Sequence, residues 1–204
     1  SDKLGRPIPG TEMRIARDGE ILLRGPHIFS AYHKDEAATR ETNNSDGWLH
    51  SGDIGDIDSA GFLQITGRKK DINITAGGEN IAPQLLEGKL KGIVAISQVV
   101  VIGDQRKYLT ALLTLDDEVL ESELSNANSS AVGADEAAQC KQLRDYLQQQ
   151  ISGINKTLAH AQAIQKFTLL ARDFSIEGGE LTPTMKIKRN IVSVKYQSQI
   201  AAMY

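Results

Sequence analysis

The sequence predicts an α+β protein: a β-rich segment, then a small domain whose central three-stranded sheet is flanked by helices. In the first third, residues 11–24 and 54–66 alternate apolar and polar side chains around turn sequences. Beyond residue 68, apolar residues take helical spacing over long stretches, interrupted by apolar runs at residues 97–103, 108–115 and 167–174. A period of two indicates strands, and spacings of three and four indicate helices.

The first third contains two predicted hairpins and one short helix. The first hairpin turns at Asp18-Gly19, because both central positions of a type I′ turn need positive φ and Asp-Gly suits them. A short helix is predicted over residues 35–41, with its start at residue 34 or 35. The second hairpin joins residues 54–57 to residues 61–66 across a turn at residues 58–61.

The small domain begins with a helix and two strands. Pro83 suits the first turn of a helix, where its missing N–H costs nothing. Apolar residues then follow at near-helical spacing: Leu85, Leu86, Leu90 and Ile93. Residues 97–103 and 108–115 flank a polar tetrapeptide and indicate paired strands. Residues 125–134, rich in Ser, Asn, Ala and Gly, indicate a surface loop.

Three more elements complete the small domain. An amphipathic helix is predicted from about Asp135 to Leu158, a third strand over residues 167–174, and a last helix from near Ile187 to the end. The two parts meet at Lys69-Lys70-Asp71, which is a candidate hinge because a few residues can absorb a large change in φ and ψ. We therefore divide the chain into residues 1–69 and residues 70–204.

The composition is that of an ordinary globular protein and excludes some functions. The 204 residues are 40% hydrophobic and 24% charged, with a net charge of −3. We expect no nucleic-acid partner, because such proteins usually show a basic bias. No apolar run is long enough for a transmembrane helix, and no secretory signal is visible. The lone Cys140 fits a reducing compartment, so we expect a cytoplasmic protein and leave membrane association open.

Residues 4–10 show no sign of a natural start, so we expect the chain to be a piece of a larger protein. The four histidines are scattered and, with one cysteine, form no metal site of recognisable spacing. No nucleophilic triad is evident either. We therefore predict no metal ligands in this chain.

Asp53 and Arg68 are candidate ligand-binding residues of the first part. Asp53 follows Gly52, which allows close approach of a ligand, and its carboxylate can accept hydrogen bonds from the vicinal diol of a ribose. Arg68 can bond a diol or a phosphate through its planar fork. The alternatives are a turn aspartate bonded to its own backbone and a surface ion pair. A calcium loop is disfavoured, because the required glycine and terminal glutamate are absent.

Lys186 is the sharpest candidate of the second part. Thr182-Pro183-Thr184 stiffens the chain before it, and Lys188 and Arg189 add positive charge. Such a lysine could bring a phosphate and a carboxylate together by offsetting their repulsion. The alternative is a solvated basic start to the last helix, an unfavourable place for cations. The pair Gly77-Gly78 permits close ligand approach but alone indicates only a loop.

The order and spacing of three segments resemble the acyl-adenylate-forming enzymes, the superfamily of acyl-CoA synthetases, luciferases and peptide-synthetase adenylation domains. Residues 47–53 resemble its ribose-binding motif. Residues 67–83 with Glu87 resemble its hinge motif, and residues 183–189 resemble its catalytic-lysine motif. Residues 179–186, Gly-Glu-Leu-Thr-Pro-Thr-Met-Lys, are similar to the long-chain fatty acyl-CoA synthetases. Residues 74–80 and 164–167 and an insertion around 120–160 are similar to their bubblegum branch.

This resemblance implies roles for particular residues. Asp53 and Arg68 would hold the ATP ribose, and Lys186 would contact the reacting carboxylate and α-phosphate. Lys70 would be the hinge, and Gly77 and Gly78 would face the coenzyme A tunnel after the small domain swings. Residues 1–69 would be the β-rich end of the large N-terminal adenylation domain. Residues 70–204 would be the mobile C-terminal domain.

The resemblance also implies a reaction and partners. Fatty acid, ATP and coenzyme A would give acyl-CoA, AMP and pyrophosphate through acyl-AMP, with Mg²⁺ on the triphosphate. The partners would be the missing N-terminal part, a long-chain fatty acid and coenzyme A, and the fragment alone would be inactive. Two alternatives stay open: a ligase that passes the acyl group to a carrier protein, and a non-catalytic interaction module with the same fold.

Overall fold

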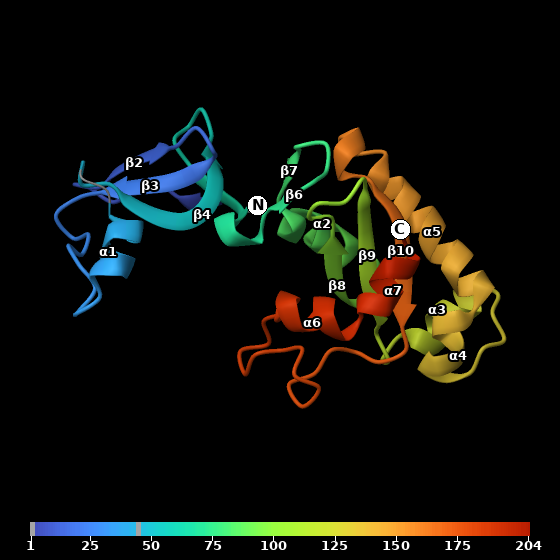
Figure 1. Cartoon of the computed structure of the whole chain (residues 1–204). Coiled ribbons are helices and arrows are strands. Elements are labelled where there is room, and N and C mark those ends of the chain that lie inside the picture. The colour runs from blue at the N-terminus through green and yellow to red at the C-terminus, as the bar shows by residue number, and fades with distance from the viewer. Residues whose placement is uncertain (1–2, 44–45) are drawn as a thin grey trace. The chain divides into compact units, whose positions relative to one another are not determined.

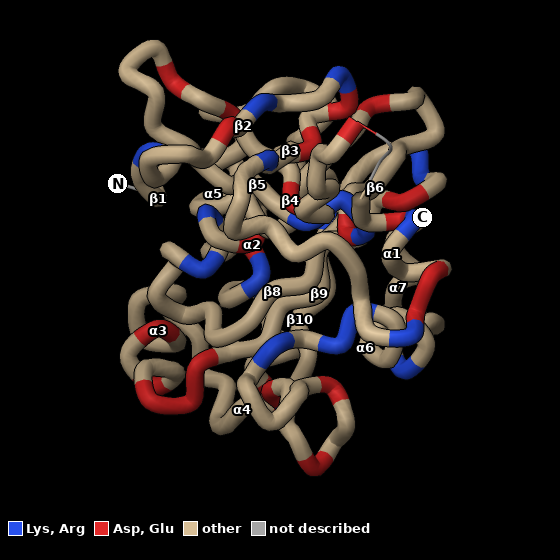
Figure 2. Tube along the Cα trace, turned by 90° about the vertical axis from the view of Figure 1, so that its left-hand side faces the viewer, with Lys and Arg blue, Asp and Glu red and all other residues tan. Residues whose placement is uncertain are grey.

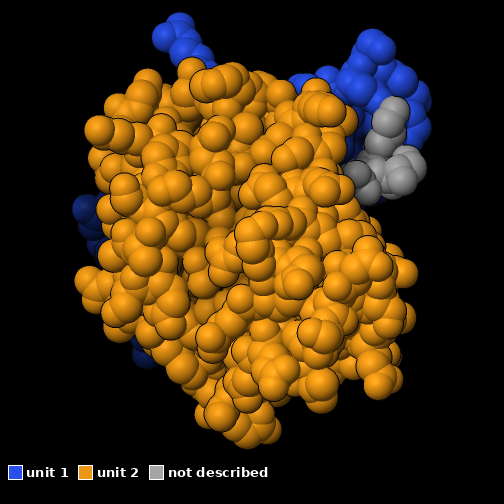
Figure 3. Space-filling model, turned by 90° about the vertical axis from the view of Figure 1, so that its right-hand side faces the viewer, with its two compact units in different colours: residues 1–72 blue, residues 73–204 orange. Residues whose placement is uncertain are grey.

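The structure is a computed structural model that describes residues 3–43 and 46–204. It forms two compact units, unit 1 over residues 1–72 and unit 2 over residues 73–204 (Figure 3). Both sheets and helices are present (Figure 1), so the predicted α+β class is confirmed. Among the described residues, no helix has the length and apolar character needed to cross a bilayer.

Unit 1 is one five-stranded antiparallel sheet with a short helix. Its elements are β1 (Lys3–Gly5), β2 (Glu12–Ile15), β3 (Glu20–Arg24), α1 (Glu36–Thr42), β4 (Leu49–Ile57), β5 (Leu63–Arg68) and the 3₁₀ turn η1 (Lys69–Asp71). The strands lie in the order β1-β5-β4-β3-β2. Asp35 caps α1 by accepting a hydrogen bond from the Ala38 amide at 2.9 Å, which satisfies one of the free amides at the helix start.

The first hairpin is confirmed, but its predicted type I′ turn is wrong. The Ala16 amide bonds the Glu20 carbonyl at 2.8 Å and the Gly19 amide bonds the Ala16 carbonyl at 3.0 Å, which leaves a three-residue loop. Among the loop residues only Gly19 has positive φ, at 85°. A turn followed by a left-handed glycine gives the same reversal and leaves Asp18 in ordinary backbone geometry.

Unit 2 is a three-stranded sheet covered by helices, with a separate small hairpin. Its elements are β6 (Asn73–Ile74), β7 (Asn80–Ile81), α2 (Pro83–Leu90), β8 (Ile96–Ile102), β9 (Leu109–Leu115), α3 (Leu120–Asn126), α4 (Gly133–Gln139), α5 (Lys141–Asn155), the 3₁₀ turn η2 (His160–Gln162), β10 (Ile164–Leu170), α6 (Arg189–Lys195) and α7 (Gln197–Ala202). The sheet order is β10-β9-β8, with β9 antiparallel to β8 and parallel to β10.

Both faces of this sheet are buried. Alternate residues of β8 point to opposite faces: Val99 and Val101 pack with α2 and α5, whereas Val100 packs with α6 and α7. In β9, Leu113 packs on the same side as Val99, and Leu112 packs on the same side as Val100. This alternation with a period of two explains why the strands are apolar at nearly every position.

Several predicted boundaries in unit 2 are wrong. The long helix is two helices, α4 and α5, because Cys140 is extended, with φ −69° and ψ 122°. This break lets Ala137 and Ala138 enter the core. The third strand runs over Ile164–Leu170 and ends before Phe174. The last helix begins at Arg189 and is interrupted at Tyr196, and the predicted loop at 125–134 overlaps the ends of α3 and α4.

Candidate functional site

The middle strand of unit 1 brings Asp53 and Arg68 together. β4 pairs with β5 so that Asp53 lies directly opposite Arg68, and the Arg68 Nε lies 2.8 Å from the Asp53 Oδ1. The Asp53 side chain is 21% exposed and that of Arg68 is 64% exposed. A carboxylate has about four acceptor sites, so this pair leaves Asp53 able to accept from a further donor. The guanidinium likewise keeps donors that face solvent.

The strand β4 is irregular where it carries Asp53. Along the pairing with β3, Glu20 lies opposite Ile54 but Leu22 lies opposite His50, so β4 has two extra residues in this interval. Gly52 lies in the bulge with φ 72°. The Asp53 amide bonds the Ser51 Oγ at 3.0 Å. Bulges bend a strand and re-aim its side chains, and they leave backbone groups that need other partners.

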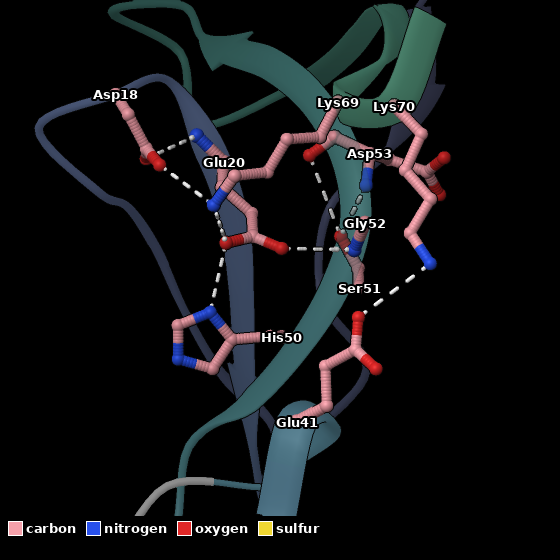
Figure 4. A network of polar contacts seen from close by, with 9 residues as sticks. All are labelled: Asp18, Glu20, Glu41, His50, Ser51, Gly52, Asp53, Lys69 and Lys70. Atoms are coloured by element: carbon pink, nitrogen blue, oxygen red, sulfur yellow. Dashed lines mark hydrogen bonds and ion pairs between the residues drawn. The ribbon is translucent and has the colours of Figure 1, made fainter. Parts of the chain in front are cut away.

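Glu20 supplies one such partner from inside the unit (Figure 4). Its side chain is 3% exposed, and its Oε1 accepts from the Gly52 amide at 3.0 Å. Its Oε2 lies 2.8 Å from the His50 Nδ1 and 2.8 Å from the Lys69 Nζ. Since an ionised carboxylate only accepts, His50 donates from Nδ1. Sequence reasoning missed Glu20, because nothing in a hairpin glutamate shows that the tertiary structure buries it.

Contacts within this network lower the pKa of Glu20 and raise the pKa of Lys69. Burial acts to raise the pKa of Glu20, but hydrogen bonds from Lys69, His50 and the Gly52 amide outweigh burial and lower it below the usual value. Lys69 also bonds Asp18 at 2.7 Å. The hydrogen bonds to Asp18 and Glu20 raise the pKa of Lys69. Both shifts favour the charged forms, the Glu20 carboxylate and the Lys69 ammonium.

Lys70, the predicted hinge residue, is held much more weakly than Lys69. Its Nζ lies 3.5 Å from the Glu41 Oε1, and both side chains are mostly exposed (Figure 4). An ion pair of this kind contributes about 0–1 kcal/mol. Lys69 and Lys70 both line a hollow of about 690 Å³ in unit 1, together with Tyr32, Ser51 and Arg68. Asp53 does not line this hollow, although its partner Arg68 does.

Lys186 is placed on a tight turn of unit 2. Leu181 and Ile187 form an isolated antiparallel bridge, and between them the Thr182 amide bonds the Lys186 carbonyl at 2.8 Å. The Thr182 Oγ1 accepts from the Lys186 amide at 3.0 Å, and Met185 has φ 61°. The backbone of Lys186 is thus fixed. Its side chain is exposed, and within the described residues its ammonium has no hydrogen bond or ion pair.

A second buried glutamate anchors this turn. Glu180 is 2% exposed and accepts hydrogen bonds from the Lys195 Nζ and from the Tyr196 hydroxyl, the latter at 3.2 Å. Its carbonyl accepts from the Lys188 amide at 2.7 Å. Burial acts to raise the pKa of Glu180, but the Lys195 hydrogen bond and two backbone amides lower it below the usual value. The two residues before Thr182 are therefore held by the helix that follows the turn.

Arg189 extends this arrangement to the start of the small domain. It forms an ion pair with Glu87 of α2, a buried residue that also accepts from the Val101 amide at 2.8 Å. Figure 2 shows basic residues along the segment that leads into α6. Because Arg189 is neutralised by Glu87, the free charges nearest Lys186 along the chain are those of exposed side chains such as Lys188.

Gly77 and Gly78 form the exposed tip of the β6–β7 hairpin. The Gly78 amide bonds the Thr75 carbonyl at 2.9 Å, and Gly78 has φ 81°. The hairpin is fastened to the loop before β9, where the Ala76 amide bonds the Arg106 carbonyl at 2.9 Å. Within unit 2 this tip and the Lys186 turn lie at opposite ends (Figure 1).

The predicted site residues thus form separate groups. Unit 1 joins Asp53 to Arg68 and places Lys70 on the same hollow as Arg68. In unit 2 the β6–β7 hairpin and the turn that precedes α6 lie at opposite ends (Figure 1). Among the described residues, no group of three or more His, Cys, Asp or Glu side chains is arranged to hold a metal ion.

Residues 70–204 match the family model described as the AMP-binding enzyme C-terminal domain. The chain belongs to this family. It is 44% identical to the long-chain-fatty-acid–CoA ligase FadD15 of Mycobacterium tuberculosis over 98% of this chain and 34% of that protein. It is 42% identical to the long-chain-fatty-acid–CoA ligase ACSBG2 of Homo sapiens over 91% of this chain and 31% of that protein. The chain therefore spans about a third of the length of these curated relatives.

Solved structures show the same fold. The adenylation domain of a carboxylate reductase from Mycobacterium chelonae superposes with a TM-score of 0.75 at 20% identity, over 98% of this chain and 31% of that one. O-succinylbenzoate coenzyme A synthetase from Bacillus subtilis, in complex with ATP and magnesium ion, superposes with a TM-score of 0.63 at 27% identity, over 93% and 35%. The predicted resemblance to adenylate-forming enzymes and to the bubblegum-like long-chain acyl-CoA synthetases is confirmed.

Proposed function

We propose that this chain is the C-terminal part of an ATP-dependent long-chain fatty acid–CoA ligase. The intact ligase joins a fatty acid to coenzyme A through acyl-AMP and releases AMP and pyrophosphate. The observation that carries the proposal is the 44% identity to FadD15 over 98% of this chain. The matching segments also carry side chains suited to binding anions and diols, at Asp53, Arg68 and Lys186.

In this proposal unit 1 supplies the ribose contacts. Asp53 accepts hydrogen bonds from the ribose hydroxyls, and Arg68 donates to them or to phosphate oxygen. The cross-strand pairing supports this role, because two residues on neighbouring strands hold their spacing without depending on loop geometry. Residues 1–69 form the β-rich end of the large adenylation domain, and residues 70–204 form the mobile domain. Lys70 is the hinge.

Lys186 brings the carboxylate and the α-phosphate together. Two unit negative charges about 4 Å apart repel by roughly 4 kcal/mol at an effective dielectric of 20. An ammonium placed between them offsets much of this repulsion and stabilises charge that develops in the transition state. An exposed, unpaired ammonium on a fixed backbone supports this role, because docking requires no ion pair within the unit to break.

The Gly77-Gly78 tip serves the second half of the reaction. We propose that it faces the coenzyme A tunnel after the small domain swings about Lys70. The separation of this tip from Lys186 within unit 2 supports the use of two surfaces of one domain in turn. ATP, Mg²⁺ and coenzyme A are the cofactors of the intact ligase, and the phosphate and acyl sites belong to its N-terminal part. With this function we propose a cytoplasmic location.

Pyrophosphate release by the full-length ligase tests the proposal. Long-chain fatty acid, ATP and Mg²⁺ should give pyrophosphate and acyl-AMP, and coenzyme A should give acyl-CoA. Lys186→Ala should slow adenylation about 100- to 1,000-fold, as expected for loss of one transition-state donor. The Lys186→Ala variant should still convert supplied acyl-AMP to acyl-CoA. Lys188→Ala, which removes an equal charge two residues away, should stay within about threefold of wild type.

Other outcomes contradict the proposal in distinct ways. Acyl transfer to a phosphopantetheinyl carrier protein but not to coenzyme A would make the protein a carrier-dependent ligase. Absence of pyrophosphate release with any fatty acid would leave a non-catalytic module. Equal adenylation by wild type and Lys186→Ala would remove Lys186 from the mechanism. The 204-residue chain alone should form no acyl-CoA.

A further inference from the structure

We propose that Glu20 is a positioning residue, which fixes the ribose-binding bulge of β4 and the starting point of the hinge through a single buried carboxylate. This inference rests on the proposed function and adds to it a residue outside the three motifs. Glu20 lines the same hollow as Arg68, and the role proposed for it is to hold other residues. It acts through Gly52 on one side and through Lys69 on the other (Figure 4).

The bulge of β4 needs an acceptor that the sheet does not offer. Two extra residues between the pairs Glu20–Ile54 and Leu22–His50 take the Gly52 amide out of the regular ladder. The Gly52 amide is part-buried, so a protein acceptor stabilises it. The Glu20 Oε1 is that acceptor, at 3.0 Å, one residue before Asp53. The position of Asp53 opposite Arg68 therefore depends on this contact.

The other carboxylate oxygen fixes the chain just before the hinge. The Glu20 Oε2 bonds the Lys69 ammonium at 2.8 Å, and Asp18 bonds the same ammonium at 2.7 Å. Among the described residues, the Lys70 side chain makes one ion pair, an exposed one with Glu41 at 3.5 Å. Lys69 is thus held more firmly than Lys70. We therefore place the first residue whose backbone torsions can change during the hinge motion at Lys70. Lys69 remains part of unit 1 in any position that the small domain takes.

Because the Glu20 carboxylate is buried, its charge depends on the donors around it. A charged carboxylate at 3% exposure is stable only while donors surround it, and here three groups from β4 and η1 do so. Glu20→Gln leaves one carbonyl oxygen for donors that the carboxylate serves with two, and it removes the charge that pairs with the Lys69 ammonium. The expected result is displacement of the bulge and of Lys69, with the rest of the sheet preserved.

The test compares Michaelis constants in the full-length ligase. Glu20→Gln should raise the KM for ATP in adenylation about tenfold, the effect of losing one hydrogen bond to a charged group. The KM for fatty acid should change less than about twofold, because that substrate binds elsewhere. Partial unfolding would instead lower kcat and leave both KM values unchanged. Lys69→Met should reproduce the KM effect for ATP, and Lys69→Arg should restore most of the wild-type value.

Glu12→Gln is the matched control. It makes the same substitution in β2 of the same sheet and removes an exposed ion pair with Arg24. It should leave the KM for ATP within about twofold of wild type, because exposed pairs contribute little. An unchanged KM for ATP in Glu20→Gln would overturn the inference.

Amide hydrogen exchange in the 204-residue chain separates this inference from the proposed function. Glu20→Ala, which removes both side-chain oxygens, should speed exchange at the Gly52 amide about tenfold or more, whereas Glu12→Ala should not. If the wild-type ligase forms no acyl-AMP, the proposed function fails, and the exchange result still decides whether Glu20 holds the bulge. An unchanged exchange rate at the Gly52 amide would refute the claim that Glu20 fixes the bulge.

Discussion

The two units bury very different amounts of apolar surface. Among the described residues, the buried hydrophobic side chains of unit 1 are Ile21, Leu22 and Trp48. Unit 2 has two hydrophobic clusters, one on each face of its sheet. A single sheet cannot bury both of its faces without a second layer. Unit 2 therefore has the construction of an independent domain, whereas unit 1 is a single sheet with a small buried core.

Both units expose some large apolar side chains, so the difference lies in what they bury. In unit 1 the buried Trp48 is contacted by two guanidinium groups, those of Arg14 and Arg24, at 4.2 and 4.6 Å from its ring centre. The small buried core of unit 1 supports the proposal that residues 1–69 belong to a larger adenylation domain.

Each unit nevertheless contains one buried glutamate that holds a proposed site segment. Glu20 holds the strand that presents Asp53, and Glu180 holds the turn that presents Lys186. In unit 1 the proposed ligand groups are already paired with each other, as Asp53 and Arg68. In unit 2 the ammonium of Lys186 is exposed. The comparison separates buried charges that hold the backbone from exposed charges available to a ligand.

The largest expected effect comes from separating the units. Residues 73–204 alone should unfold cooperatively with urea, because both faces of their sheet are covered. Residues 1–72 alone should show no cooperative transition, since a chain of this length is marginal even with a full core. Circular dichroism follows the first fragment, and the fluorescence of Trp48, the single tryptophan, follows the second. A sharp Trp48 transition in isolated residues 1–72 would break the comparison.

A core truncation should be the next largest effect. Leu112 is fully buried between the sheet and the last helices, so Leu112→Ala should lower the free energy of unfolding by about 2–5 kcal/mol. Ile65→Ala in unit 1 removes a side chain that is 38% exposed, and should cost less than about 1 kcal/mol. Urea unfolding of the whole chain, followed by circular dichroism and Trp48 fluorescence, measures both. Equal costs would mean that the two units are packed alike.

Acid should weaken both units through their buried glutamates. The folded-state pKa values of Glu20 and Glu180 lie below their ordinary values. Each carboxylate therefore stabilises the fold above its unfolded pKa, and this stabilisation is lost as the pH falls through the folded pKa. Glu180→Gln should flatten the fall in stability below about pH 5 seen by circular dichroism. Glu20→Gln should flatten the fall seen by Trp48 fluorescence. A slope unchanged by either variant would exclude that residue as the source.

The smallest expected effect concerns a local helix cap in unit 1. Asp35→Ala removes the acceptor for the Ala38 amide and should lower the free energy of unfolding by about 1 kcal/mol. Asp35→Asn keeps an acceptor and should cost less. Trp48 fluorescence during urea unfolding measures both variants. A cost above that of Leu112→Ala would contradict the view that unit 1 has little packed core to lose.

Local signals in the sequence were sufficient for many elements. Pro83 predicts the start of α2 because it needs no amide partner there, and α2 begins at that residue. The short helix near residues 35–41, the two hairpins and the strands β8 and β9 were predicted from residues only a few positions apart. The order of three motifs predicted the family. The roles of Asp53, Arg68, Lys70, Gly77, Gly78 and Lys186 remain predictions.

Tertiary structure alone decided which charges are buried and which residues meet across strands. Hydrophobic spacing continues through Cys140, but the extended backbone of Cys140 ends α4 there, and Ala137 and Ala138 pack into the core. The sequence does not show that Glu20 and Glu180 are buried, because burial depends on elements distant along the chain. Short-range propensity acts over one turn or hairpin, whereas desolvation of a carboxylate and its donors is decided only when the whole unit closes.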